Sequence, residues 1–206
     1  MDSPSFDVFH GSMPVGRFVI HRRKTGGKET KCSVSIFQKQ VMIVVYGIRK
    51  AQITDWNAIQ TIYAGARKFM AQTGNPNQWG KDRPLEKTLE KDISEGNLYV
   101  LTRDGIIHGV FAFLLGEDPT YGYIDGAWRS NTPYGTIHRI ASDGSGGVLK
   151  AAVAFCSGIC PHIRIDTHRD NHIMRERITR NGFQECGIIY LENGDPRIAY
   201  ELLPTE

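Results

Sequence analysis

Residues 135–168 constrain the fold of this 206-residue chain more than any other stretch. Residues 135–141 are rich in apolar side chains and predict a strand, and residues 162–168 predict a second one. Between them, the turn 143–147 precedes apolar residues at helical spacing: Val148, Leu149, Ala152, Phe155, Cys156 and Ile159. A strand, a turn, a helix and a strand form a βαβ crossover, whose two strands are parallel neighbours.

The turn Asp143-Gly-Ser-Gly-Gly147 has the composition of an anion-binding loop. Its glycines leave the backbone open to a ligand. The first N–H groups of the following helix lack intrahelical partners and lie at the positive end of the helix dipole, which suits a phosphate or pyrophosphate. The alternative is a flexible connection without a ligand. A Walker A loop is excluded because no Gly-Lys-Ser/Thr is present, and the dinucleotide fingerprint is incomplete because Leu149 replaces its third glycine.

The segment after the second strand adds a more specific pattern. The sequence "DTHRDN" leads into a predicted helix over 172–181, "HIMRERITRNGF", and Gly182 stands where a left-handed residue commonly ends a helix. Together with the glycine turn and the final "CGIIYLENGDPRIAYEL", these motifs resemble the GNAT superfamily of N-acyltransferases over about residues 46–203. The resemblance implies acetyl transfer from acetyl-CoA to an amine.

The rest of the chain predicts the elements that complete such a fold. Strands are expected at 42–51 and 121–128, and hairpins at 97–103 with 106–115 and at 183–191 with 197–203. Apolar positions predict one helix over 56–70 and another that Gly96 ends. We therefore expect an α/β fold of the acyl-CoA N-acyltransferase type. It has three layers, α-β-α, around a mixed, mostly antiparallel sheet with a central parallel βαβ pair.

The resemblance assigns a set of cofactor-binding positions. It implies that the two parallel strands splay apart and that the pantetheine arm lies between them, against the backbone of Arg139, Ile140 and Ala141. The pyrophosphate falls on the N–H groups of Gly144, Ser145, Gly146, Gly147 and Val148. The chain departs from the family pattern, Arg/Gln-x-x-Gly-x-Gly/Ala, because Ala141 occupies its first position, and Asp143 adds a negative charge beside the proposed anion.

Asn171 is a further candidate for cofactor binding. The resemblance implies that it contacts the β-alanine part of the pantetheine arm. The alternative is a helix N-cap, a common role for Asn or Asp before a helix, and Asp170 could fill it equally well.

The candidate catalytic residues follow from the chemistry of amine acylation. The amine must lose a proton, and His138 on the first parallel strand is the candidate base, with Asp125 and Glu117 behind it and an interior structural histidine as the alternative. The family often has a tyrosine that protonates the leaving thiolate, at the position of Ile178. Tyr190, His168 and Tyr134 are the candidate substitutes, and the thiol is a good enough leaving group to depart almost unaided.

Composition limits the other functional classes. Residues 1–41 carry a net charge of +4 and show no sustained helical or strand period, so we expect a disordered basic extension before the domain at 42–206, with a basic arm or a transit-like segment as alternatives. The remaining residues carry −1, so we expect no nucleic-acid or membrane binding. Four cysteines without a CxxC pair indicate reduced thiols in the cytoplasm. We expect no metal, because the predicted helix start at Asn171 interrupts the polar series from Asp166 to His172. Trp79 is expected to cover the acceptor site or to fill the core.

We expect one catalytic domain acting on a small-molecule or peptide amine, with a homodimer left open. Two other classes are retained as alternatives. One is a regulatory module that binds acyl-CoA without turnover, which the isoleucine at 178 and the alanine at 141 favour. The other is a nucleotide-binding α/β protein, which NAD or ATP would stabilise.

Overall fold

The computed structural model describes residues 19–21, 33–35 and 46–204. Most of the predicted basic extension, 1–41, lies outside these residues. Within it, strand β1 (Val19–His21) pairs antiparallel with β2 (Ser33–Ser35).

Within residues 46–204, eight strands form one mixed sheet in the order β3-β4-β5-β7-β8-β10-β9-β6. Their bounds are Gly47–Lys50 (β3), Leu98–Arg103 (β4), Ile106–Leu115 (β5), Asp125–Gly126 (β6), Gly135–Ser142 (β7), Ile163–Thr167 (β8), Gln184–Tyr190 (β9) and Pro196–Leu202 (β10). All neighbours pair antiparallel except β7 and β8, which are parallel. The predicted mixed sheet with a central parallel pair is confirmed.

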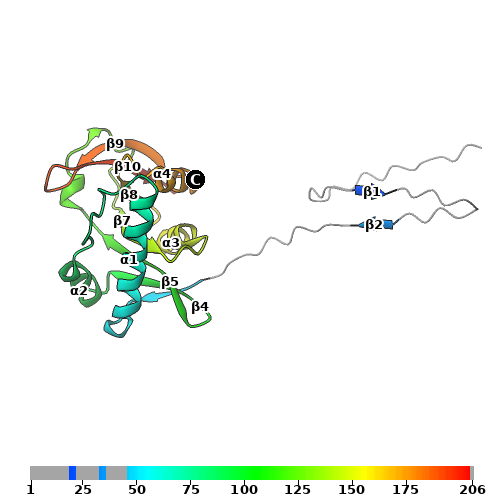
Figure 1. Cartoon of the computed structure of the whole chain (residues 1–206). Helices are drawn as coiled ribbons and strands as arrows, with labels where there is room; N and C mark the ends of the chain where they lie inside the picture. The colour runs from blue at the N-terminus through cyan, green and yellow to red at the C-terminus, as the bar shows by residue number, and fades with distance from the viewer. Residues whose placement is uncertain (1–18, 22–32, 36–45, 205–206) are drawn as a thin grey trace, which may run out of the picture. The chain divides into compact units, whose positions relative to one another are not determined.

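In the part of the chain that the structure describes, four α-helices cover the two faces of the sheet (Figure 1). They are α1 (Trp56–Gln72), α2 (Glu86–Ser94), α3 (Val148–Ser157) and α4 (His172–Arg180). Their apolar faces give two separate cores. One core contains Ile59 and Tyr63 of α1 and Leu89 of α2, and the other contains Ala152 of α3 and Ile178 of α4. Three layers result, as predicted.

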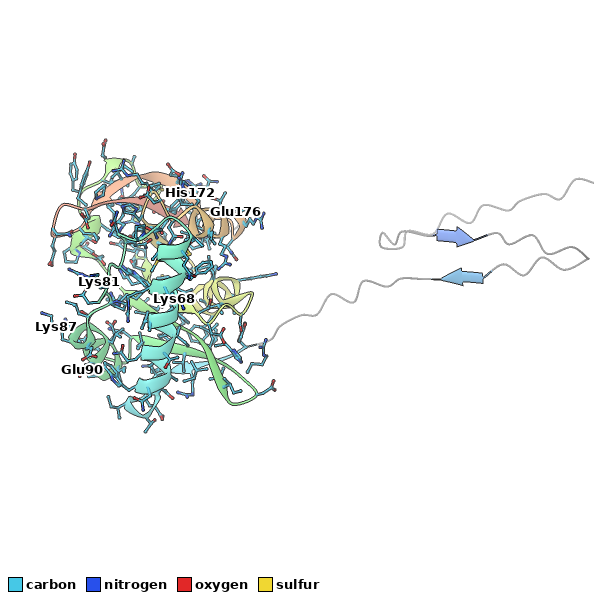
Figure 2. The ribbon with its side chains drawn as sticks, in the orientation of Figure 1. Lys68, Lys81, Lys87, Glu90, His172 and Glu176 are labelled. Carbon is cyan, nitrogen blue, oxygen red and sulfur yellow. The ribbon has the colours of Figure 1, made fainter. Side chains whose placement is uncertain are left out.

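The outer faces of the helices are charged. Figure 2 shows Lys68 on α1 and Lys87 and Glu90 on α2 among the exposed side chains. None of the helices in the described part of the chain is both long and apolar enough to cross a membrane.

The strand predicted over 121–128 is wrong in its extent. Only Asp125–Gly126 forms a strand, and the segment before it folds into a short 3-10 helix, η2 (Pro119–Tyr121). The carboxylate of Asp118 accepts the backbone N–H of Thr120 at 2.8 Å and so caps this turn. The ring of Tyr121 is buried instead of alternating along a strand. Capping by an Asp before a Pro thus outweighs the strand propensity of the aromatic residues that follow.

The parallel pair opens after three residues. β7 pairs with β8 only from Gly135↔Ile163 to Ile137↔Ile165. On its other side, β7 has a bulge in which Arg139 and Ile140 face Phe111, and Arg139 adopts a φ of 52°. Because a bulge bends its strand and interrupts the hydrogen-bond ladder, β7 turns away from β8 at this point.

Candidate active site

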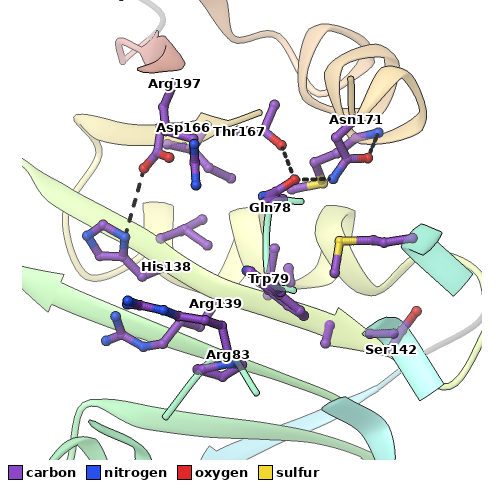
Figure 3. A pocket seen from close by; sticks show the side chains of 18 of the residues that line it. Gln78, Trp79, Arg83, His138, Arg139, Ser142, Asp166, Thr167, Asn171 and Arg197 are labelled. Atoms are coloured by element: carbon purple, nitrogen blue, oxygen red, sulfur yellow. Dashed lines mark hydrogen bonds and ion pairs between the residues drawn. The ribbon is translucent and has the colours of Figure 1, made fainter. Parts of the chain in front are cut away.

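A cavity of about 1090 Å³ opens where β7 and β8 part (Figure 3). Its walls are β7 from Ile137 to Ser142, β8 from Ile165 to Thr167, and the first turns of α3 and α4. The side of α1 and the loop 77–85 close it on the remaining face. The cavity therefore lies at the position that the βαβ pattern predicts for a ligand.

Some polar groups of the glycine loop, residues 143–147, already form hydrogen bonds within the protein. The carboxylate of Asp143 accepts the N–H of Ser145 at 2.9 Å, and the carbonyl of Gly146 accepts the hydroxyl of Tyr46 at 2.8 Å. Among the described residues, the N–H groups of Gly146, Gly147 and Val148 have no hydrogen-bond acceptor. These three donors at the start of α3 are the ones that an anion could use.

Asp143 lines the cavity, and both of its carboxylate oxygens form hydrogen bonds within the protein. Its second carboxylate oxygen lies 2.8 Å from Nδ1 of His108, which in turn lies 3.2 Å from the hydroxyl of Ser145. Burial opposes the charge of Asp143, but the hydrogen bonds from Ser145 and His108 outweigh it and lower the pKa of the carboxyl. The carboxylate that counted against phosphate binding is therefore hydrogen-bonded to Ser145 and His108.

The bulge in β7 is fixed from the opposite layer. The hydroxyl of Tyr63 donates to the carbonyl of Arg139 at 2.8 Å, and the guanidinium of Arg139 lies 2.7 Å from the Asp92 carboxylate. Burial raises the pKa of Asp92, and the charge of Arg139 opposes that shift. The left-handed backbone of Arg139 is thus anchored to both α1 and α2.

His138 stands beside the bulge and faces the cavity. Its Nε2 lies 2.8 Å from Oδ2 of Asp118, and its Nδ1 lies 4.0 Å from Oδ1 of Asp166. Burial alone would raise the pKa of Asp118, but hydrogen bonds from His138 and Thr120 hold it well below its usual range. An ionised carboxylate only accepts hydrogen bonds, so Nε2 carries the hydrogen. In the neutral ring, the lone pair is then on Nδ1.

Asp166 lies opposite Nδ1 of His138, across the gap of 4.0 Å between the two side chains. Its Oδ1 accepts the hydroxyl of Tyr121 at 2.8 Å. Burial and the charge of Asp166 raise the pKa of Tyr121 well above its usual value, so the phenol remains a donor. Nδ1 of His138 and Oδ1 of Asp166 are two acceptors that an N–H-bearing group between them could join.

A polar cluster from the loop between α1 and α2 reaches the other end of the cavity. Oε1 of Gln78 accepts Nδ2 of Asn75 at 2.7 Å and Nδ2 of Asn171 at 2.9 Å, and Oγ1 of Thr167 lies 3.5 Å away (Figure 3). Oδ1 of Asn171 also accepts the N–H of Met174 at 3.1 Å. Asn171 is therefore the N-cap of α4, the alternative that the sequence left open, while its side chain lines the cavity.

The predicted site residues divide into two groups. The first group lines the cavity and consists of His138, Arg139, Ile140, Ala141, Gly144, Val148 and Asn171. Ser145, Gly146 and Gly147 do not line it. Tyr190 is also absent from the lining, and its exposed ring lies against Tyr123 at a centroid distance of 6.2 Å, so the structure does not bring it to the reacting groups.

The remaining candidates from the sequence also differ in whether they line the cavity. Trp79 lines the cavity and packs edge-on against Tyr63. His168, Tyr134, Glu117 and Asp125 do not line it.

Sequence analysis missed three residues with clear positions in the cavity: Asp118, Gln78 and Arg197. Only Asp118 left a signal, since it precedes a proline as a helix-capping Asp does, one residue after the candidate Glu117.

Comparisons with known proteins identify relatives of this fold. No family profile and no curated protein matches the chain. A GNAT-family acetyltransferase from Streptococcus agalactiae is 30% identical, with a TM-score of 0.68, and the match covers 78% of this chain and 96% of that one. A GNAT-family acetyltransferase from Listeria monocytogenes is 20% identical, with a TM-score of 0.56, over 76% of this chain and 95% of that one. A ribosomal-protein-alanine N-acetyltransferase from Brucella melitensis is 16% identical, with a TM-score of 0.53, over 76% and 98%.

Proposed function

This chain belongs to the GNAT family of acetyltransferases, and we propose that it transfers an acetyl group from acetyl-CoA to a primary amine by direct attack in a ternary complex. The observation that carries the proposal is the cavity at the opening between β7 and β8, with His138 at its edge. The part of the cavity between the separated strands β7 and β8, called the slot below, provides space for a thioester, and His138 provides a base beside it. The acceptor is a small molecule or a peptide.

The residues present fit acetyl-CoA. The backbone of Arg139, Ile140 and Ala141 lines the slot past the point where β7 leaves β8, so the bulge leaves main-chain groups for the pantetheine arm. The free N–H groups of Gly146, Gly147 and Val148 would hold the pyrophosphate. Acetyl-CoA supplies the activated acyl group, and the protein positions it.

His138 takes the proton from the amine. The Asp118 carboxylate, 2.8 Å from Nε2, fixes the ring so that Nδ1 points to the gap in front of Asp166. An amine bound in that gap donates to Asp166 and gives its proton to Nδ1, and the Asp118 charge stabilises the imidazolium that forms. Asp118 is thus a positioning residue, and His138 is the catalytic base.

The departing thiolate has no tyrosine acid. Ile178 occupies the position of the family's tyrosine on α4, and its side chain is fully buried in the core. The candidate substitutes Tyr190, His168 and Tyr134 do not line the cavity. We infer that the thiolate leaves without a dedicated side-chain acid, which a thiol allows.

The test is release of CoA thiol from acetyl-CoA with a panel of primary amines, together with thermal stabilisation by acetyl-CoA. We expect stabilisation and amine-dependent release, and we expect His138→Gln to abolish the release while retaining the stabilisation. Stabilisation without release for any amine would instead indicate a module that only binds acyl-CoA. Stabilisation by NAD or ATP, and not by acetyl-CoA, would refute the proposal.

A further inference from the structure

Arg197 is a nearly buried cation on the acceptor side of the cavity, and neither the fold nor the proposed chemistry requires it there. Its side chain is 5% exposed and lines the cavity. It comes from β10, whereas the glycine loop follows β7. Figure 3 shows Arg197 and His138 toward one side of the cavity, with Ser142 and Asn171 toward the other.

The sheet register explains why Arg197 faces the cavity. Ile137, Ile165 and Ile198 of β7, β8 and β10 all point into the core with α3 and α4. Because side chains alternate along a strand, the adjacent residues point to the opposite face. His138, Asp166 and Arg197 therefore share the face that the α1–α2 loop covers. His138 is level with Asp166 in the register, and Arg197 lies diagonally across from Asp166, two residues along β10 from its partner Ala199.

The guanidinium of Arg197 has few partners on this face. Nη1 donates to the carbonyl of Pro196 at 3.0 Å, and Nη2 lies 3.9 Å from the half-exposed carboxylate of Asp195. Among the described residues, its Nε has no hydrogen-bond partner. A guanidinium carries five N–H donors, so within the described residues most of those of Arg197 remain available to a ligand in the cavity.

Asp166 does not supply the missing partner. Its Oδ1 accepts the Tyr121 hydroxyl and lies 4.0 Å from Nδ1 of His138, and it forms no ion pair with Arg197 within the described residues. Burial lowers the pKa of Arg197, and the nearby charge of Asp166 opposes that shift. Arg197 remains cationic at neutral pH, as arginine does in proteins.

We propose that the acceptor is an amine that also carries a carboxylate or phosphate, and that Arg197 binds this anionic group. The inference rests on the proposed function, because it places the amine between His138 and Asp166. Arginine suits the role because its planar fork binds a carboxylate or phosphate through two parallel hydrogen bonds.

The strand spacing limits the distance between the two groups of the acceptor. One strand separates β7 from β10, which places their backbones about 10 Å apart, and the offset of Arg197 by two residues along β10 brings its backbone to about 12 Å from that of His138. The long side chain of Arg197 spans part of that distance. The acid and the amine of the acceptor therefore lie within a few bonds of each other, as in an amino acid or an aminoalkyl phosphate.

The main competitor is a polyamine. Asp82, Glu192 and Asp195 line the same cavity and are exposed, and they would favour a second positive charge on the acceptor. The two classes of acceptor differ in the sign of their second charge, which is negative in an amino acid or aminoalkyl phosphate and positive in a polyamine. Acceptors that differ only in this second group therefore distinguish the two classes.

The experiment compares kcat/KM for amino acids, their carboxamides, the amines that lack the acid, aminoalkyl phosphates and diamines. We expect an acid-bearing acceptor to exceed its neutral analogue by at least about tenfold, the effect of one charge-assisted hydrogen bond. The carboxylate and phosphate arms identify which anion the site takes. Arg197→Gln should bring the ratio of acid to carboxamide close to one, and Arg197→Lys should retain part of it.

Arg180→Gln is the control, since Arg180 is exposed and, among the described residues, forms an ion pair only with Glu176 on the surface of α4. KM for acetyl-CoA and the melting temperature report whether a variant is folded. If Arg197→Gln does not fold, the ratio in the wild-type enzyme and in Arg197→Lys decides. The inference about Arg197 would be overturned by equal rates for acid and carboxamide, by a preference for diamines, or by an unchanged ratio in the variants. The proposed acetyl transfer would stand in each of these cases. The absence of release with every amine would refute the proposed function as well.

Discussion

Substitution of Asp118 by Asn tests the catalytic arrangement while changing almost no volume. Oδ2 of Asp118 lies 2.8 Å from Nε2 of His138, and Oδ1 accepts both the N–H and the hydroxyl of Thr120. The Asn oxygen can keep Thr120, so its NH₂ group faces His138. Nε2 must then accept a hydrogen bond, which moves the ring hydrogen to Nδ1 and removes the base from the amine side.

The expected loss follows from the strength of the contact. A hydrogen bond to a charged group contributes about 1.5–3 kcal/mol. At about 1.4 kcal/mol per factor of ten, losing it in the transition state lowers kcat/KM for the acceptor roughly 10- to 150-fold. KM for acetyl-CoA and the melting temperature should stay close to those of the wild type, because Asn can keep the hydrogen bonds to Thr120 and the backbone N–H of residue 118 still donates to the Tyr134 hydroxyl.

The assay is CoA-thiol release with the best acceptor of the panel, applied to a double-mutant cycle. If Asp118 acts only through His138, the double variant Asp118→Asn/His138→Gln should be no slower than His138→Gln alone. Glu117→Gln is the matched control, since that exposed carboxylate is one residue away and outside the cavity. The reasoning fails if Asp118→Asn stays within about twofold of the wild type, or if the two losses multiply.

Three further predictions concern the loop and the core. Gly146 has no atom within 4 Å of the place of an added Cβ and no positive φ, so Gly146→Leu should fold and weaken acetyl-CoA binding by about tenfold, more than Gly146→Ala; equal affinities by calorimetry would contradict this. Glu201 is fully buried and accepts from His162, Arg164 and the N–H of Arg129, so Glu201→Gln should lower the free energy of unfolding in urea by about 3–5 kcal/mol; a loss below about 1 kcal/mol would count against it. Burial raises the pKa of Cys156 to about 12, so mass spectrometry should find it unalkylated at pH 8 until the protein unfolds, and rapid alkylation of the native protein would show otherwise.

The fold was predictable because local signals agreed with the global arrangement. The apolar faces of α1 and α3 and the Asp104-Gly105 hairpin turn each specify one element, and the glycine turn after β7 forces the parallel pair. The one clear failure, the strand over 121–128, arose where a capping Asp118 and a buried Tyr121 compete with strand propensity. Propensity could not resolve that competition, because the burial of Tyr121 depends on residues far away in the sequence.

Among the residues that line the cavity, the sequence pointed to positions on β7 and its glycine turn, and to Trp79 and Asn171 elsewhere. His138 and the residues from Arg139 to Ala141 share one strand, so one motif located them. Gln78, Asp118 and Arg197 come from three other segments, and only the register of the sheet and the path of two loops bring them to the cavity. Nothing in the immediate sequence of Arg197 distinguishes it from an arginine on an ordinary strand.

The bulge in β7 links the two halves of the proposed reaction. His138 still pairs with Ala112, whereas Arg139 and Ile140 together face Phe111, so the ladder breaks directly after the base. Because the strand bends there, the histidine faces the acceptor side while the next three residues turn their backbone to the slot. The Tyr63 hydroxyl holds the carbonyl of Arg139 at 2.8 Å, and this contact fixes the bend from α1. A shift of that anchor would move the base and the cofactor slot together, so the separation of amine and thioester is set by one backbone feature and not by the two binding sites independently.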